Sequence, residues 1–107
     1  MSEKPRENPE PTKQNSSALF AAIGGNDWRS FMLLLNSNAD LNARGPGGIT
    51  PLMSAIEHNN RKVYLHLLSL NNIDFGAVDD NGQSALALAI KKGNRMVAMS
   101  LQSKGVK

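Results

Sequence analysis

The chain repeats itself at a period of about 33 residues, and this period constrains the fold more than any other feature of the sequence. Leu19 and Leu52 lie 33 residues apart, and Leu52 and Leu86 lie 34 apart. The same register aligns three further sets of apolar residues: Ala22 with Ala55 and Ala89, Ile23 with Ile56 and Ile90, and Leu34 with Leu67 and Leu101. A unit this short cannot bury an apolar face alone, so the units are predicted to stack side by side.

Each unit is predicted to hold two short helices and a turn. In the second unit, Thr50 can cap a helix through its hydroxyl, and Pro51 suits the first helical position because the N–H that it lacks has no partner there. This helix is expected to end near residue 57, and a second helix to span 61–69. The corresponding helices are expected at 17–23 and 27–36 in the first unit and at 84–92 and 94–103 in the third. Polar stretches rich in Gly and Asn then join one unit to the next.

The second unit also carries a recognisable motif. Residues 48–55 read Gly-Ile-Thr-Pro-Leu-Met-Ser-Ala, which resembles the opening of the ankyrin repeat, G-x-T-P-L-H-x-A, and residues 33–35 and 39–42 resemble its ending. The resemblance covers 16–107 and implies an all-α fold: an ankyrin-repeat solenoid of about three helix-turn-helix units with connecting hairpin turns, at about 16–48, 49–82 and 83–107. The family's histidine is replaced by Phe20, Met53 and Ala87, so we expect lower stability than an idealised array would have.

The first fifteen residues differ in composition from the rest of the chain. Residues 1–15 contain three prolines and many charges, and Met1 is their only hydrophobic residue. Such a segment cannot bury enough apolar surface to offset the entropy lost on ordering. We therefore expect a disordered polar tail over 1–15 and a repeat domain over 16–107. The charges of the tail balance, so the net charge of +3 belongs to the repeats.

The composition excludes several kinds of chemistry. The chain has no cysteine, which excludes a disulfide, a thiolate metal site and a cysteine nucleophile. The two histidines, His58 and His66, have no tight carboxylate cluster beside them, and the resemblance places His66 at a core leucine position. No serine lies in a G-x-S-x-G motif, and residues 45–48, which read Gly-Pro-Gly-Gly, lack the following Gly-Lys-Ser/Thr of a phosphate-binding loop. We expect no enzymatic activity, no cofactor and no metal.

The charge pattern and the N-terminus bear on partners and location. No long basic run with interleaved aromatic residues is present, so a weak basic nucleic-acid binder is the less favoured alternative. Nothing in the N-terminal segment resembles a signal peptide, and nowhere do about 18 apolar residues run together. We expect a cytoplasmic monomer without membrane contact. A bacterial effector delivered to a host cell without a cleavable signal is the alternative.

Recognition of a protein partner, as an adaptor or an inhibitor, is the function that the sequence favours. The ankyrin resemblance implies binding through turn tips and the exposed ends of the first helices, on the concave face of the stack. Nine residues fall there, and we call them the predicted strip: Arg44, Ile49, Glu57, His58, Val78, Asp80, Gln83, Lys91 and Lys92. Ile49 is expected to be exposed, without a role in folding, at the centre of the interface. An exposed edge at Met96 and Met99 is the alternative site.

Overall fold

The computed structural model describes residues 13–37 and 39–106, and in this part of the chain every regular element is helical. The α-helices are α1 (Lys13–Gly24), α2 (Trp28–Asn36), α3 (Pro51–Glu57), α4 (Arg61–Leu68), α5 (Ala85–Lys91) and α6 (Arg95–Ser103). A 3₁₀ turn, η1 (Pro46–Gly48), precedes α3, and a single bridge pairs Val78 with Ser84. The predicted all-α class is confirmed for the described residues.

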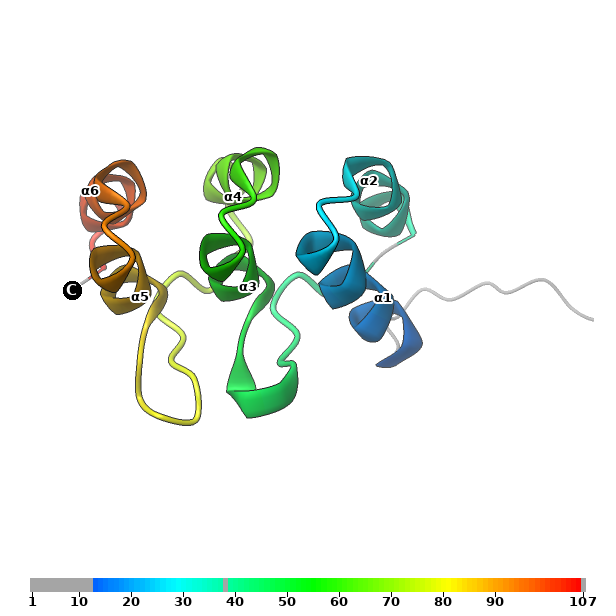
Figure 1. Ribbon diagram of the computed structural model, residues 1–107, viewed down its shortest axis with the longest axis horizontal. Helices are drawn as coiled ribbons and strands as arrows, with labels where there is room; N and C mark the ends of the chain where they lie inside the picture. Colours follow the sequence, from blue (N-terminus) through cyan, green and yellow to red (C-terminus); the bar gives the residue numbers. More distant parts are fainter. Residues whose placement is uncertain (1–12, 38, 107) are drawn as a thin grey trace, which may run out of the picture.

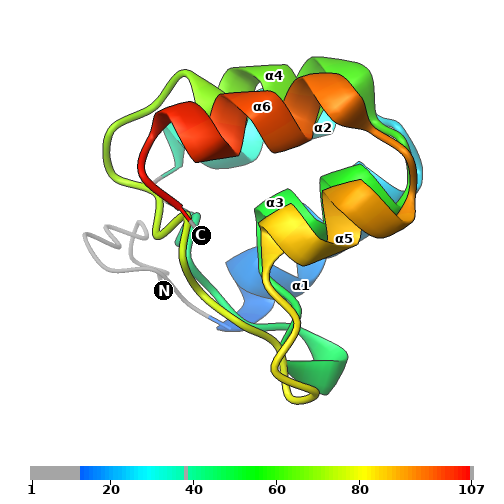
Figure 2. The ribbon, with the colours of Figure 1, turned by 90° about the vertical axis from the view of Figure 1, so that its left-hand side faces the viewer.

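The helices form consecutive pairs, α1 with α2, α3 with α4 and α5 with α6, and the pairs lie side by side (Figure 1). Within this stack, α1, α3 and α5 make one layer and α2, α4 and α6 the other. Figure 2, which looks along the stack, shows the pairs almost superimposed. The turns that join paired helices lie at one edge, and the loops that join successive pairs lie at the other.

The first helix starts earlier than the sequence pattern indicated. Helix α1 begins at Lys13, four residues before the expected start at residue 17. Residues 13–15, which we assigned to the polar tail, therefore form the first turn of α1. The rest of the predicted tail, 1–12, lies outside the described residues.

The repeated apolar positions form one continuous core. Leu52 and Leu67, which the register places in it, are 2% and 0% exposed, so this prediction is confirmed. Two aligned residues depart from the pattern at the ends of the stack: Leu34 is half-buried, and Ile90 is 60% exposed. Ile56, at the same position as Ile90 in the preceding unit, is 1% exposed because α5 packs against α3. Among the described residues no further pair covers Ile90.

The turn within each pair is built in the same way three times. The second helices are capped by the side chains of Asp27, Asn60 and Asn94, each of which accepts the N–H of the residue three positions later. The residues before these caps have positive φ angles: Asn26 at 57°, Asn59 at 55° and Gly93 at 74°. Asn and Gly adopt this left-handed conformation more readily than other residues. The sequence therefore sets the chain reversal between paired helices.

Asn60 also joins the first unit to the second. Its side chain is 3% exposed, and Nδ2 donates to the carbonyl of Ile23 at 3.0 Å while Oδ1 accepts from the N–H of Val63 at 3.4 Å. We expect Asn60→Ala to lower the free energy of unfolding by about 2 to 3 kcal/mol, because a helix cap is lost and a buried carbonyl loses its donor. Asn94→Ala removes the cap bond to Val97 and should cost about 1 kcal/mol. Urea denaturation measures both losses, and equal losses would contradict the joining role of Asn60.

Candidate functional site

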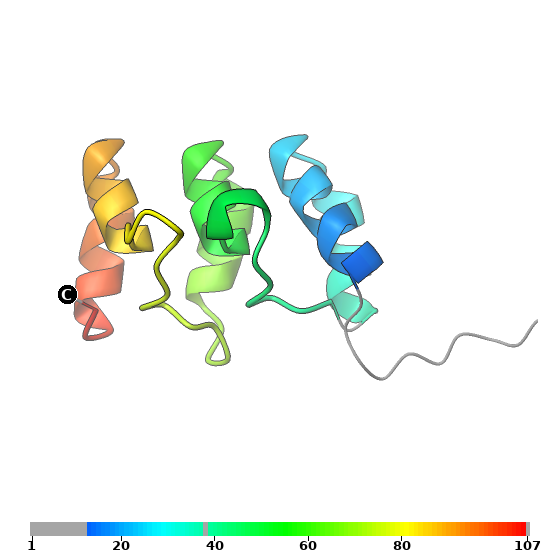
Figure 3. The same ribbon diagram turned by 90° about the horizontal axis from the view of Figure 1, so that it is seen from below.

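The loop that joins α2 to α3 and the loop that joins α4 to α5 project from the same edge of the stack and lie next to each other (Figures 1 and 3). They are joined near their tips, where the N–H of Asp80 donates to the carbonyl of Gly47 at 2.9 Å. Arg44 adds two bonds, since its Nη1 donates to the carbonyl of Gly48 at 3.0 Å and to that of Val78, in the neighbouring loop, at 2.6 Å. The guanidinium of Arg44 therefore braces the loops, in addition to any contact that it makes with a partner.

The bases of the loops are joined as well. The side chain of Asn42 donates to the carbonyl of Asn72 at 2.9 Å and accepts the N–H of Asp74 at 2.7 Å. Asp40 and Asp74, aligned in the sequence, each accept an N–H two residues later, from Asn42 at 2.9 Å and Gly76 at 3.2 Å. The loops thus form a braced surface, which reduces the entropy that a partner must remove on binding.

The residues of the predicted strip fall into two groups. The loop group contains Arg44, Ile49, Val78, Asp80 and Gln83, and the helix-end group contains Glu57, His58, Lys91 and Lys92. Helices α3 and α5 start at the loops and end at the turns between paired helices (Figure 2). Each has seven residues, so its length separates the two groups by about 10 Å. Both groups border the layer of α1, α3 and α5, which Figure 3 shows from the side of the loops.

Ile49 is not the exposed residue that we expected. It is half-buried, packs against the apolar core, and accepts a hydrogen bond at its carbonyl from the N–H of Gly45 at 2.7 Å. The expectation that Ile49 has no role in folding is therefore wrong. Its extended backbone, at φ −74° and ψ 135°, leads directly into the Thr50 cap of α3, and the β-branched side chain covers part of the core there. A substitution of Ile49 would change stability together with any contact to a partner.

The helix-end group is exposed and lightly bonded. The Nζ of Lys92 lies 3.5 Å from Oε2 of Glu57, an ion pair between α5 and α3 whose exposure makes its contribution to stability small. Nδ1 of His58 lies 2.9 Å from the carbonyl oxygen of Ser54. A carbonyl oxygen only accepts, so Nδ1 carries the proton and donates. These side chains can contact a partner without loss of a core interaction.

His66 has a packing role. It is half-buried, and its ring meets the rings of Trp28 and Phe31 edge-on, with centroids 5.8 and 6.1 Å away. His66 thus joins α4 to α2, in agreement with its predicted place on the core side. In residues 16–37 and 39–106, no group of three or more His, Cys, Asp or Glu side chains is placed to hold a metal ion.

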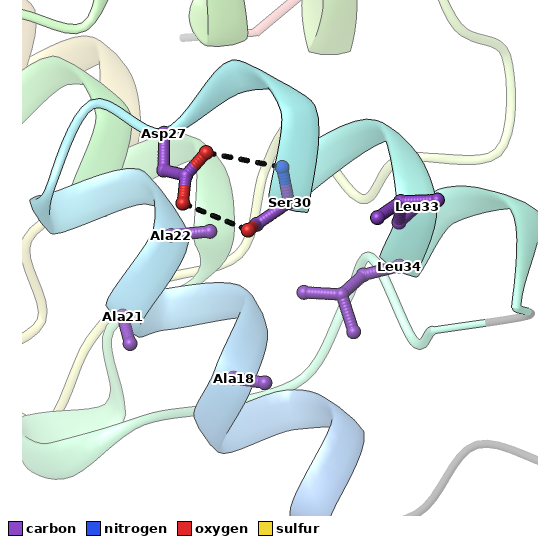
Figure 4. Close-up of a pocket in the computed structure, with 7 residues that line it drawn as sticks. All are labelled: Ala18, Ala21, Ala22, Asp27, Ser30, Leu33 and Leu34. Atoms are coloured by element: carbon purple, nitrogen blue, oxygen red, sulfur yellow. Dashed lines mark hydrogen bonds between the residues drawn. The ribbon is translucent and has the colours of Figure 1, made fainter.

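An apolar groove of about 380 Å³, which the sequence pattern did not reveal, lies between α1 and α2 at the N-terminal end of the stack (Figure 4). The residues that line it are Ala18, Ala21, Ala22, Asp27, Ser30, Leu33 and Leu34. The carboxylate of Asp27 accepts the Oγ–H of Ser30 at 2.7 Å and its N–H at 3.2 Å. These two hydrogen bonds hold the pKa of Asp27 below its ordinary value of 3.8.

The groove is exposed because, among the described residues, no further unit packs against this side of α1 and α2. Ala18 is exposed, whereas Pro51 and Ala85, which occupy the same position in the next two units, are buried. Each of those residues lies in a helix that packs against the preceding unit. Leu33, at 61% exposure, is the most exposed large apolar residue of the described chain. The run of leucines at 33–35 was the one feature of the sequence that pointed to this groove.

No family model matches the chain. A solved structure is similar to it: a chain of the complex described as the Bd0816 predatory endopeptidase from Bdellovibrio bacteriovorus with the immunity protein Bd3460. The two chains superpose with a TM-score of 0.73 and are 31% identical over 91% of this chain. The alignment covers 48% of the solved chain, so the present chain spans about half its length. The all-helical stack is therefore shared with a chain of a protein–protein complex.

No helix in the described part of the present chain has the length and apolar character needed to cross a membrane.

Proposed function

We propose that this chain is an ankyrin-repeat protein without catalytic activity, and that it binds and inhibits an enzyme. The similarity to a chain of an endopeptidase–immunity protein complex carries the proposal, because it extends over 91% of this chain at 31% identity. Of the two proteins in that complex, we take the immunity protein as the counterpart.

The ankyrin assignment rests on local geometry that recurs between units. Thr50 and Ser84 cap the first helices of their units, each by accepting the N–H three residues later. The loops before these two helices carry a glycine at the same place, Gly48 and Gly82, and both have a φ of 77°. Together with the repeated turns between paired helices, these features match the helix-turn-helix units with hairpin connections that the sequence motif implies.

The predicted strip supplies the surface for the partner. Val78 is 44% exposed in a braced loop, and Asp80 is exposed beside it. Apolar residues at the centre of an interface, surrounded by polar ones, contribute most to affinity. We therefore place Val78 at the centre of the contact and the helix-end group, with its lysines, at the rim. A monomer in the cytoplasm is the state that we expect to act.

Capture of the partner tests this function. The tagged full chain is incubated with a lysate of the cells that produce it naturally, and the bound proteins are identified by mass spectrometry. Each captured enzyme is then assayed for activity with and without the chain. We expect one captured enzyme to lose activity when the chain is added. A captured enzyme whose activity the chain leaves unchanged would contradict the inhibitor role.

Val78→Glu should weaken binding to the captured enzyme by about tenfold or more, because it introduces a charge at the predicted centre of the contact. Met99→Glu is the matched control, since Met99 is also apolar and 60% exposed but lies on α6, outside the strip. Titration calorimetry measures both affinities, and thermal melting checks that both variants stay folded. Weaker binding of Met99→Glu alone would move the site to the methionine edge.

A further inference from the structure

Charge is divided between the two edges of the stack. We define the turn edge as the turns between paired helices with the adjoining helix ends, and the loop edge as the opposite side. The turn edge carries six basic and two acidic residues: Arg29, Arg61, Lys62, Lys91, Lys92 and Arg95, with Asp27 and Glu57. Among the side chains that the structure describes, the loop edge carries four acidic and two basic residues: Asp40, Asp74, Asp79 and Asp80, with Arg44 and Lys104. The turn edge is therefore a cationic surface on a chain whose net charge is only +3.

A groove of about 500 Å³ crosses the turn edge between the second and third units. Its walls include the cationic side chains of Lys92 and Arg95, the imidazole of His58, and the side-chain amides of Asn59 and Asn94. The Oδ1 of Asn94 is occupied by the cap bond to the N–H of Val97, at 3.2 Å. Cations and amide N–H donors together suit a carboxylate, which can accept several hydrogen bonds at once.

The acidic residues of this edge neutralise only part of its charge. Glu57 pairs with Lys92, and Asp27, at the far end of the edge, accepts two hydrogen bonds from Ser30. Arg95, which begins α6, lines the groove, and Lys91, which ends α5, lies beside it; both are exposed. A ligand at the groove would therefore meet an excess of positive charge at close range.

We propose that this groove takes an acidic segment of the protein partner, with two or three Asp or Glu side chains near Lys92 and Arg95. The inference rests on the proposed function and names the chemistry of the partner's surface. Lys91 and Lys92 belong to the predicted strip, so the groove extends the strip around the helix ends. Charge complementarity at such a rim accelerates association and selects the partner.

The same surface is poorly suited to nucleic acid. Stacking on exposed aromatic rings contributes to the binding of single strands. Here Tyr64, which lines the groove, is 4% exposed, and the ring of Trp28 packs against Phe31 and His66 with Lys62 Nζ 5.4 Å from its centroid.

The test uses the ¹⁵N-labelled full chain and a hexaglutamate peptide as the probe. We expect amide shifts to change at Asn59 and over 92–95, and the affinity to fall as salt is raised. Arg95→Glu should weaken binding at least fivefold. It should also stay folded, because an acidic residue in the first turn of α6 is favoured by the helix dipole. Lys104→Glu is the matched control: it makes the same change in net charge at the loop edge, and it should weaken binding less than twofold.

Several outcomes would overturn the inference. These are shift changes centred on the loop edge, equal losses in the two variants, and no binding of the peptide at low salt. If a short single-stranded DNA binds the same residues more tightly than hexaglutamate at the same salt, the ligand of this groove is nucleic acid and not an acidic protein segment. The proposed function is judged separately. If the captured enzyme still binds through the loops, failure of the peptide to bind overturns this inference alone, whereas failure to capture any enzyme counts against the function.

Discussion

Leu67→Ala is expected to destabilise the stack by about 2 to 5 kcal/mol, among the largest losses that a single core substitution causes. Leu67 is 0% exposed and lies on α4, in the middle unit, where it belongs to a core cluster that continues into both neighbouring units. Truncation removes buried apolar surface and leaves a cavity that the surrounding helices can fill only in part. Because a domain of this size has a total stability of about 5 to 15 kcal/mol, the variant should be partly or wholly unfolded in mild denaturant.

Leu65→Ala provides the matched control, since it makes the same chemical change on the same helix. Leu65 is 38% exposed, so its truncation should cost about 1 kcal/mol or less. Urea denaturation followed by far-ultraviolet circular dichroism gives both losses, provided that the slopes agree. Similar losses for the two variants would mean that the register of α4, and with it the assignment of the two faces, is wrong.

Gly48→Ala is the second substitution for which we expect a large effect, a loss of about 2 to 4 kcal/mol. Gly48 is buried and has a φ of 77°, a conformation that strains any residue with a side chain. A Cβ atom here would also collide with the carboxylate of Asp80 and lie 2.9 Å from its backbone nitrogen. That nitrogen donates to the carbonyl of Gly47, so relief of the collision would break the bond that joins the loops.

Gly82→Ala separates strain from collision. Gly82 occupies the same place in the next loop and has the same φ of 77°, but in the described part of the chain no atom beyond its two chain neighbours lies within 4 Å of the Cβ it would gain. Its substitution should therefore cost about 1 to 2 kcal/mol, the strain alone. Urea denaturation of the two variants measures the difference. Equal losses would show that the loops can separate without cost and that the bond between Asp80 and Gly47 does not brace them.

The period of the sequence was sufficient to predict the helices and most of the core, because residues such as Leu52 and Leu67 recur where each unit packs on itself. It failed where burial depends on a neighbour. Ile90 has the same identity as Ile56 but is exposed, since coverage of this position comes from the following unit. Periodicity alone cannot show which units have a neighbour on both sides, nor how far the first helix extends.

The candidate site was only partly predictable, because its loops are irregular. The bond from Arg44 to the carbonyl of Val78 joins residues 34 positions apart, and no repeat pattern predicts it. Ile49 was misjudged for the same reason, since its burial depends on the path of the chain into Thr50. The cationic groove was not predicted, because the net charge does not show where the repeat register places each charged residue. The register places Arg61 and Arg95 at equivalent positions in the second and third units.

The exposed ends of the stack have a consequence for how a chain of this kind can grow. Among the described residues, only the second unit is covered on both sides, and Val63 and Leu68 are buried in it. The first unit has Ser30 at the position of Val63, and the third unit has Gln102 at the position of Leu68. Duplication of the middle unit would insert a segment already compatible with both neighbours. Duplication of a terminal unit would instead enclose Ser30 or Gln102 between helices, at the cost of burying a polar group. A further copy of the middle unit is therefore expected to be tolerated better than a further copy of the first or the third unit.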